Sequence, residues 1–145
     1  MTGVDTNILV YAHREDSPFH ERAFQCVSSL AEGRAEWVIP WPCIHEFLAI
    51  VTHPRIYLPP TPLPKALSQV DAWFESPSLV LLGENSGYWQ TAKKLIRSAQ
   101  IQGPQIHDAR IAAICLHHGV TELLTSDRDF GRFTPLKTRN PLVDS

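Results

Sequence analysis

The stretch "IHDARIAAICLHHGVTELLTSDRDFGRF", residues 106–133, contains the pattern that decides the fold class. Its apolar residues first recur at helical spacing, which predicts a helix that begins at Asp108 and stops at Gly119. "VTELLT" (120–125) is then predicted to form a short strand, and the polar segment "SDRDFGRF" (126–133) a loop. A helix that leads into a strand with acidic residues behind it is typical of α/β proteins, which bind ligands at the carboxyl ends of their parallel strands.

The same alternation of helices and strands runs through the rest of the chain. The first apolar run, "GVD" followed by "ILVYA", is compatible with one strand or with a strand that turns into a helix. The other predicted helices run from Ser17-Pro18 to Gly33, from Pro42 to before Pro54, from about Lys65 to Phe74, and from a cap near Asn85 or Ser86 to Ala99. The other predicted strands are "EWVIP" (36–40), "LVLLG" (79–83) and, as a candidate edge strand, "LKTRN" (136–140).

Length and composition predict one domain over residues 1–145. A chain of 145 residues with 43% hydrophobic content is long enough to bury one core. We expect a three-layer α/β sandwich whose central, mostly parallel sheet is flanked by helices. Neither a signal peptide nor a membrane-spanning stretch is recognisable, so we expect a cytoplasmic protein. The three cysteines are widely spaced and form no C-x-x-C pair, which favours buried thiols over a zinc site or disulfides.

The charge is divided unevenly along the chain. The net charge is −2, but residues 1–92 carry five Lys/Arg and ten Asp/Glu, whereas residues 93–145 carry eight and five. The second part therefore has a balance of +3. This distribution is compatible with an RNA partner but does not identify one.

Four acidic residues are candidate site residues: Asp5, Glu46, Asp108 and Asp127. Asp5 follows the first short apolar piece, Asp127 lies just past the end of the predicted strand 120–125, and Asp108 opens a predicted helix. Taken singly, Asp5 and Asp108 could be helix N-caps, and Asp127 could be a turn residue. Glu46 is more informative, because it is the only formally charged residue between Trp37 and Pro54. A carboxylate in such apolar surroundings needs a cation or strong donors, unless it points to solvent from an amphipathic helix.

Taken together, the carboxylates predict a metal site. Several of them at one end of a sheet would repel one another unless a divalent cation lay between them. Mg²⁺ or Mn²⁺ prefers such oxygen ligands and can activate water for attack on phosphorus, so phosphodiester hydrolysis is the predicted chemistry.

Other catalytic classes lack their motifs. His45-Glu46 is not followed by a second histidine at zincin spacing, and the chain contains no G-x-S-x-G and no P-loop. His107, beside Asp108, could contact a substrate or be purely structural. A phospho-receiver or phosphatase would also place acids at strand ends, but its acidic pair or D-x-D is absent from the N-terminal "DTN". A binding module that keeps the fold without catalysis remains an alternative.

Three ordered motifs carry a family resemblance: "VDTNILVYA" (4–12), "HEFLAIVTHPR" (45–55) and the stretch 106–133 quoted above. With these motifs the sequence resembles PIN-domain proteins and, among them, the VapC toxins of bacterial type II toxin–antitoxin pairs. The likeness covers nearly the whole chain.

The resemblance implies a PIN fold and an Mg²⁺- or Mn²⁺-dependent endoribonuclease. The family's four acids fall on Asp5, Glu46, Asp108 and Asp127, with Asp5 and Asp108 as the expected principal metal ligands. The residues implied to have auxiliary roles are Thr6, Asn7, Ser126 and Asp129. Members of the family commonly form homodimers and are silenced by an antitoxin protein, so both partners, together with an RNA substrate, are expected here.

Two features depart from the family pattern. Gly3 stands in the first strand, where a glycine weakens pairing. The proline-rich "LPPTPLP" (58–64) is expected to form a stiff surface excursion. This excursion and rim residues such as Arg128 and Arg132 are expected to affect RNA specificity but not the chemistry.

Overall fold

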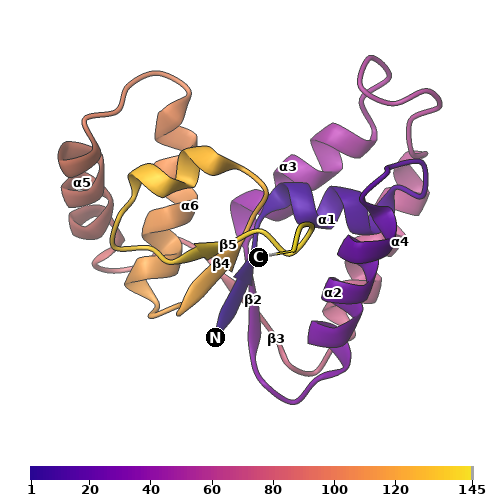
Figure 1. Ribbon diagram of the computed structural model, residues 1–145, viewed down its shortest axis with the longest axis horizontal. Helices are drawn as coiled ribbons and strands as arrows, with labels where there is room; N and C mark the ends of the chain where they lie inside the picture. Colours follow the sequence, from indigo (N-terminus) through magenta and orange to yellow (C-terminus); the bar gives the residue numbers. More distant parts are fainter. Residues whose placement is uncertain (145) are drawn as a thin grey trace.

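The computed structural model describes residues 1–144, in which five strands form one parallel sheet with the order β3-β2-β1-β4-β5 (Figure 1). Helices α5 and α6 lie together on one side of the sheet, and α1, α2 and α4 lie on the other (Figure 1). The strands are β1 (Thr2–Val4), β2 (Trp37–Pro40), β3 (Leu79–Leu82), β4 (Glu122–Leu124) and β5 (Thr138–Arg139). The helices are α1 (Thr6–His13), α2 (His20–Glu32), α3 (Trp41–Val51), α4 (Leu63–Phe74), α5 (Tyr88–Ala99) and α6 (Gln105–His117), with a 3₁₀ helix, η1 (Arg128–Arg132). The predicted three-layer α/β architecture is confirmed.

The N-terminal apolar run is a strand that turns into a helix. β1 ends at Val4, and α1 begins at Thr6. Asp5 between them has an extended backbone, and its side chain accepts a hydrogen bond from the N–H of Thr6, which caps the helix. The structure thus resolves the alternative that periodicity left open.

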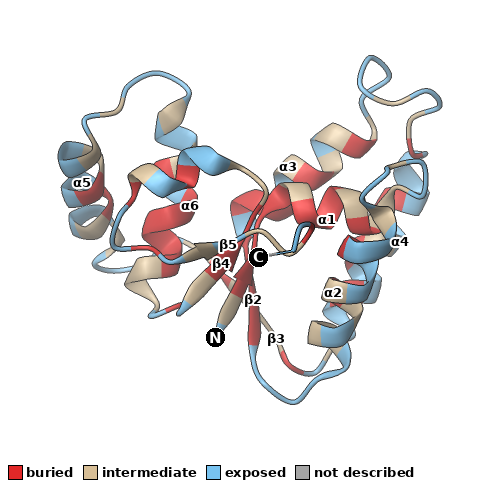
Figure 2. Cartoon of the chain, in the orientation of Figure 1, coloured by how far each residue is buried: buried red, intermediate tan, exposed pale blue. Residues whose placement is uncertain are grey.

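The core lies around the central strands and the helices that cover them. Val4, Val38 and Leu123, which come from three adjacent strands, are all fully buried. Figure 2 shows the buried residues concentrated in β1, β2, β4 and the facing sides of α1 and α6. Because a parallel sheet is covered on both faces, its strands read as continuous apolar runs.

Gly3 allows the close approach of β1 to its neighbours. A Cβ added at this position would lie 3.2 Å from Cδ1 of Leu123 and 3.3 Å from Cγ1 of Val120. Both side chains are buried and cannot easily move away. The glycine that was expected to weaken the strand thus avoids a tight contact with Leu123 and Val120.

Helix α6 begins at Gln105, three residues before the predicted start. Pro104 precedes it at the N-cap position, so Asp108 lies in the first turn and is not the capping residue. The predicted stop is nearly correct: the helix ends at His117, and Gly119 has a φ of 71°.

Two other helix starts also differ from the prediction. α5 is preceded by Gly87 with a φ of 89°, and no side chain of Asn85 or Ser86 caps it. α2 begins at His20, because Ser17 accepts a hydrogen bond from the N–H of Phe19 in a turn that precedes the helix.

The proline-rich segment is a surface excursion, as predicted. Leu58 is 85% exposed, whereas the buried Thr61 donates its N–H to the carbonyl of Val51 at 2.7 Å. α4 starts soon afterwards, at Leu63. Within residues 1–144, every helix is too short or too polar to cross a membrane.

Candidate metal centre

The acidic candidates lie near the carboxyl ends of the central strands. Asp5 directly follows β1, and Asp127 comes shortly after the end of β4. Glu46 is carried by α3, which continues directly from β2, and Asp108 lies in the first turn of α6. Four distant segments thus converge because parallel strands end at the same edge of the sheet.

Asp5 is the most deeply buried of these acids, with 4% of its surface exposed. Its Oδ2 accepts a 2.7 Å hydrogen bond from the hydroxyl of Thr125, and its Oδ1 accepts a 2.8 Å bond from the N–H of Thr6. Burial raises the pKa of Asp5 to about 6, and the nearby Glu46 and Asp108 add to this rise, whereas the two hydrogen bonds oppose it. The hydrogen bonds hold the carboxylate in place, but its ionised form is unfavourable without a cation nearby.

Glu46 is half-buried and has a specific partner. The hydroxyl of Thr6 donates a 2.8 Å hydrogen bond to its Oε2. A carboxylate in an apolar segment needs a strong donor or a cation, and Thr6 is such a donor. Through its N–H and its hydroxyl, Thr6 contacts both Asp5 and Glu46.

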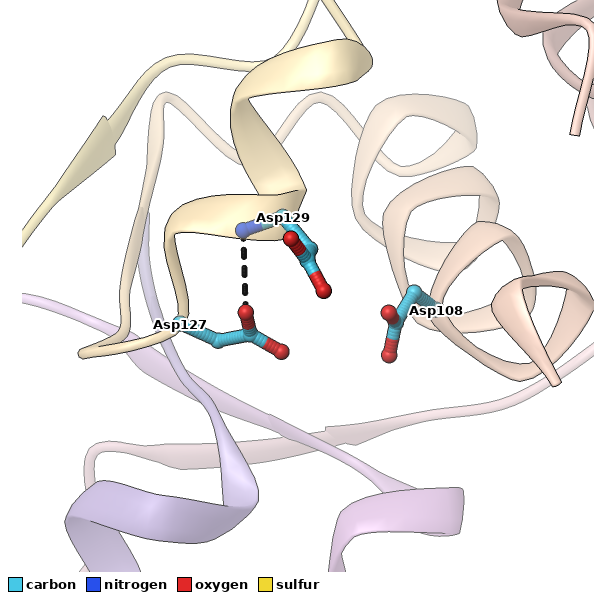
Figure 3. A group of neighbouring side chains, drawn as sticks. All are labelled: Asp108, Asp127 and Asp129. Atoms are coloured by element: carbon cyan, nitrogen blue, oxygen red, sulfur yellow. Dashed lines mark hydrogen bonds between the residues drawn. The ribbon is translucent and has the colours of Figure 1, made fainter.

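Asp108, Asp127 and Asp129 form a tight acidic cluster. Each offers a carboxylate oxygen, and the three oxygens all lie within 4.8 Å of one another. Figure 3 shows Asp108 on its helix facing the two other carboxylates, and the N–H of Asp129 donating to Oδ1 of Asp127 at 2.9 Å. Partial burial, followed by repulsion from Asp127, Asp129 and Glu46, raises the pKa of Asp108 to about 6.

Thr125 is a positioning residue that the sequence reasoning missed. Besides donating to Asp5, its hydroxyl accepts a 3.0 Å hydrogen bond from the N–H of Asp127. The signal that would have identified it is the pairing of β1 with β4. Val4 lies opposite Leu124, so Asp5 and Thr125, which follow them, are neighbours. Once β1 and β4 are paired, Thr125 must lie beside Asp5.

The remaining two auxiliary candidates contact each other. Asn7 and Ser126 lie at the same edge, and the N–H of Ser126 donates to Oδ1 of Asn7 at 3.3 Å. The family resemblance implied that the hydroxyl of Ser126 helps to hold Asp127, but the hydroxyl that accepts from the N–H of Asp127 is that of Thr125. Asn7 thus ties the start of α1 to the loop after β4.

The donor set fits a hard divalent cation. Carboxylate and hydroxyl oxygens are the donors that Mg²⁺ and Mn²⁺ prefer, and the geometry supplies three carboxylate oxygens within reach of one ion. The raised pKa values of Asp5 and Asp108 show that these negative charges are incompletely compensated by protein groups. A bound cation would supply the missing compensation.

Comparison with known proteins identifies relatives that cover nearly the whole chain. Residues 4–134 match the family model of the PIN domain. The chain is 33% identical over 142 residues to Ribonuclease VapC43 of Mycobacterium tuberculosis, and the match covers 98% of this chain and 96% of that protein.

Solved structures of low sequence identity share the fold. The crystal structure of VapBC2 from Rickettsia felis bound to a promoter DNA fragment aligns with a TM-score of 0.72 at 18% identity, covering 96% of this chain and 97% of that one. A toxin–antitoxin complex from Klebsiella pneumoniae aligns with a TM-score of 0.62 at 16% identity, covering 97% and 98%.

Proposed function

Because this chain belongs to the PIN-domain family and, within it, to the VapC proteins, we propose that it is a metal-dependent endoribonuclease that acts as the toxin of a type II toxin–antitoxin pair. The observation that carries the proposal is the convergence of five carboxylates from four chain segments at one sheet edge. Such a cluster has no evident role in stability, since like charges at close range repel. It suits an enzyme that acts on a phosphodiester with the help of a cation.

We assign the principal metal-ligand roles to Asp5 and Asp108. Glu46 and Asp127 complete the site or orient the attacking water, and Asp129 is an auxiliary ligand. The ion that we propose is Mg²⁺, with Mn²⁺ as a substitute, because both take oxygen ligands. The chemistry that such an ion supplies is acidification of water and neutralisation of charge on the phosphate.

The protein groups around the ligands orient them before substrate arrives. Thr125 and the N–H of Thr6 fix both oxygens of Asp5, and the Thr6 hydroxyl fixes one oxygen of Glu46. The other auxiliary pair, Asn7 and Ser126, keeps α1 close to the loop that carries Asp127. Preorganised ligands of this kind need no rearrangement during the reaction.

The test is RNA cleavage by purified, partner-free protein. We expect cleavage of RNA with Mg²⁺ or Mn²⁺, loss of activity with EDTA, and a decrease of about two orders of magnitude or more for Asp5→Asn. Asp71→Asn is the matched control, because Asp71 is exposed on α4 and takes no part in the carboxylate cluster. Expression of the wild type should arrest growth, and Asp5→Asn should relieve the arrest. If wild-type protein left all cellular RNA intact with either ion, the toxin function would be refuted.

The proposed protein partners are an antitoxin and a second copy of the chain. The basis for the first is membership of the VapC family, together with the fold that the chain shares with the Klebsiella pneumoniae toxin–antitoxin complex. A small open reading frame immediately upstream should encode this antitoxin, and its product should copurify with the chain and abolish cleavage. Light scattering of the free protein should give twice the mass of one chain. A monomeric mass would exclude the homodimer without affecting the nuclease assignment.

A further inference from the structure

A cavity lies beside Glu46, on the side of α3 that faces α6. It has a volume of about 540 Å³ and is lined by Pro42, His45, Glu46, His107 and Arg110. His107 and Arg110 are three positions apart on α6, so they lie on the same face of the helix. The cavity therefore joins Glu46 of the carboxylate site to the guanidinium of Arg110.

Arg110 has unused hydrogen-bonding capacity at this cavity. Its Nε donates to Oε1 of Glu84, and its side chain is 47% exposed. Within residues 1–144, this is the one hydrogen bond that its guanidinium makes, which leaves the two Nη groups available. A guanidinium whose orientation is held at Nε is well suited to bind a phosphate with its remaining donors.

Stability does not explain the pair of Arg110 and Glu84. Both side chains are substantially exposed, and ion pairs of this kind contribute little to folding. The position of the pair at the rim of the carboxylate cavity is more informative. An acidic site repels a polyanionic strand, so binding requires cations on the approaches to it.

A second arginine, Arg132, lies beside Asp129. Arg132 donates from Nε to the backbone carbonyl of Asp129 at 3.1 Å, and its Nη2 lies 3.5 Å from Oδ1 of the same residue. Its charge also lowers the pKa of Asp108, although burial and the neighbouring acids outweigh this effect. The carboxylates thus have Arg132 on the Asp129 side and Arg110 on the Glu46 side.

We propose that Arg110 binds a backbone phosphate of the RNA strand on the Glu46 side of the carboxylates, one step along the strand from the phosphate that is cleaved. This inference rests on the proposed nuclease function and adds the path of the substrate. The strand crosses the site between Arg132 and Arg110, and Glu84 holds the Arg110 guanidinium at the rim. Arg110 is a substrate-binding residue and takes no part in bond cleavage.

The test compares Arg110→Gln with Arg34→Gln, in cleavage of a single-stranded oligoribonucleotide between about 50 and 200 mM salt. Arg34 is exposed and precedes β2, at the opposite edge of the sheet, so the control removes the same charge far from the cavity. For Arg110→Gln we expect KM to rise about 5- to 10-fold and kcat to change less than about 2-fold. A plot of the logarithm of the RNA binding constant against the logarithm of the salt concentration has a negative slope. The magnitude of this slope should decrease by about 0.7, the value for one phosphate contact to a single strand. Arg34→Gln should match the wild type in all three quantities.

Arg110→Lys separates the charge from the fork-shaped geometry. Lysine keeps the positive charge but not the bidentate donors, so we expect it to retain the salt slope while KM rises about 2- to 3-fold. Thermal melting of both variants should stay within a few degrees of the wild type. If Arg110→Gln matched Arg34→Gln, or lowered kcat with KM unchanged, the inference would be overturned while the nuclease function stood. Absence of cleavage by the wild type would instead overturn the proposed function, and the inference with it.

Discussion

The hydroxyl of Thr125 donates a 2.7 Å hydrogen bond to Oδ2 of Asp5, although the two residues are 120 positions apart in sequence. The contact follows from the register of the sheet, because Val4 of β1 lies opposite Leu124 of β4. The same hydroxyl accepts the N–H of Asp127 at 3.0 Å. One small side chain thus fixes the relative positions of two of the proposed site acids.

Thr125→Val should lower the cleavage rate by about 10- to 100-fold with little change in KM, the magnitude typical of lost partners of metal ligands. Valine has nearly the same shape, but it leaves Oδ2 of the buried Asp5 without its donor and so raises the pKa of that carboxyl further. The pH–rate profile should therefore move to higher pH. Single-turnover cleavage from about pH 5 to about pH 9 measures both effects.

Thr125→Ser keeps the hydroxyl and should restore most of the rate. Thr121→Val is the matched control, because Thr121 precedes the same strand at its other end and its hydroxyl contacts the carbonyl of Met1. A Thr125→Val protein as active as the control would show that the hydrogen bond to Asp5 does not matter for catalysis.

Asp5 should lower the stability of the metal-free protein as the pH rises from about 4 to about 6. The pKa of Asp5 is raised from 3.8 to about 6, so in this window the unfolded chain releases the proton while the folded chain retains it. Asn at this position has no proton to release. Asp5→Asn should therefore exceed the wild type in unfolding free energy at about pH 8 by up to about 3 kcal/mol, and the difference should vanish near about pH 4.

Urea unfolding in EDTA, at several pH values, checks this prediction. Asp108, whose pKa is raised in the same direction, should add to the loss in the wild type. Asp71→Asn serves again as the control, because it removes an exposed carboxyl from α4. Equal stabilities of Asp5→Asn and wild type across the whole range would contradict the burial of an uncompensated charge.

Much of the architecture could be predicted from the alternation of helical and strand periodicity. The run "WVIP" is the buried strand β2, because a strand covered on both faces shows no polar alternation. The apolar run "LVLL" is the mostly half-buried edge strand β3. Strand order could not be predicted in this way, since periodicity describes each segment alone. Thr125 was missed for this reason: its partner Asp5 is identified only by the pairing of β1 with β4.

The relative burial of the acids could not be predicted from the sequence. Glu46 stands in an apolar segment, yet it is half-buried, whereas Asp5 is 4% exposed. Local composition describes the element that carries a side chain but not the elements that cover it. Asp5 follows the central strand β1 and contacts Thr125, which follows β4, and Cys43 on α3, which follows β2. The start of α6 was displaced for a similar reason, as a capping aspartate and a first-turn aspartate look alike in sequence.

Gly3→Ala should destabilise the protein by about 1 kcal/mol. This is expected even though alanine reduces the conformational entropy of the unfolded chain, an effect that by itself stabilises the folded protein by about 0.4–1 kcal/mol. The new methyl group would lie 3.2 Å from Leu123 and 3.3 Å from Val120, and such overpacking costs about 1–3 kcal/mol. Gly131→Ala is the control, because a Cβ there has open space around it. Denaturant unfolding measures both variants, and an equally stable or more stable Gly3→Ala would show that β1 can move away from β4.

Divalent cations should stabilise the folded protein through the carboxylate cluster. At about one hundred times the dissociation constant, Mg²⁺ or Mn²⁺ would add about 2.7 kcal/mol, and Tm would rise by about 5–10 °C for a chain of this size. Asp108→Asn and Asp127→Asn each remove one of the three clustered carboxylates and should abolish most of the rise, whereas Asp71→Asn should retain it. Because protons compete for Asp5 and Asp108, whose pKa values are raised to about 6, the rise should be smaller at about pH 5 than at about pH 8. Equal rises in Asp108→Asn and wild type would place the ion elsewhere, whereas no rise in any variant would argue against a metal site.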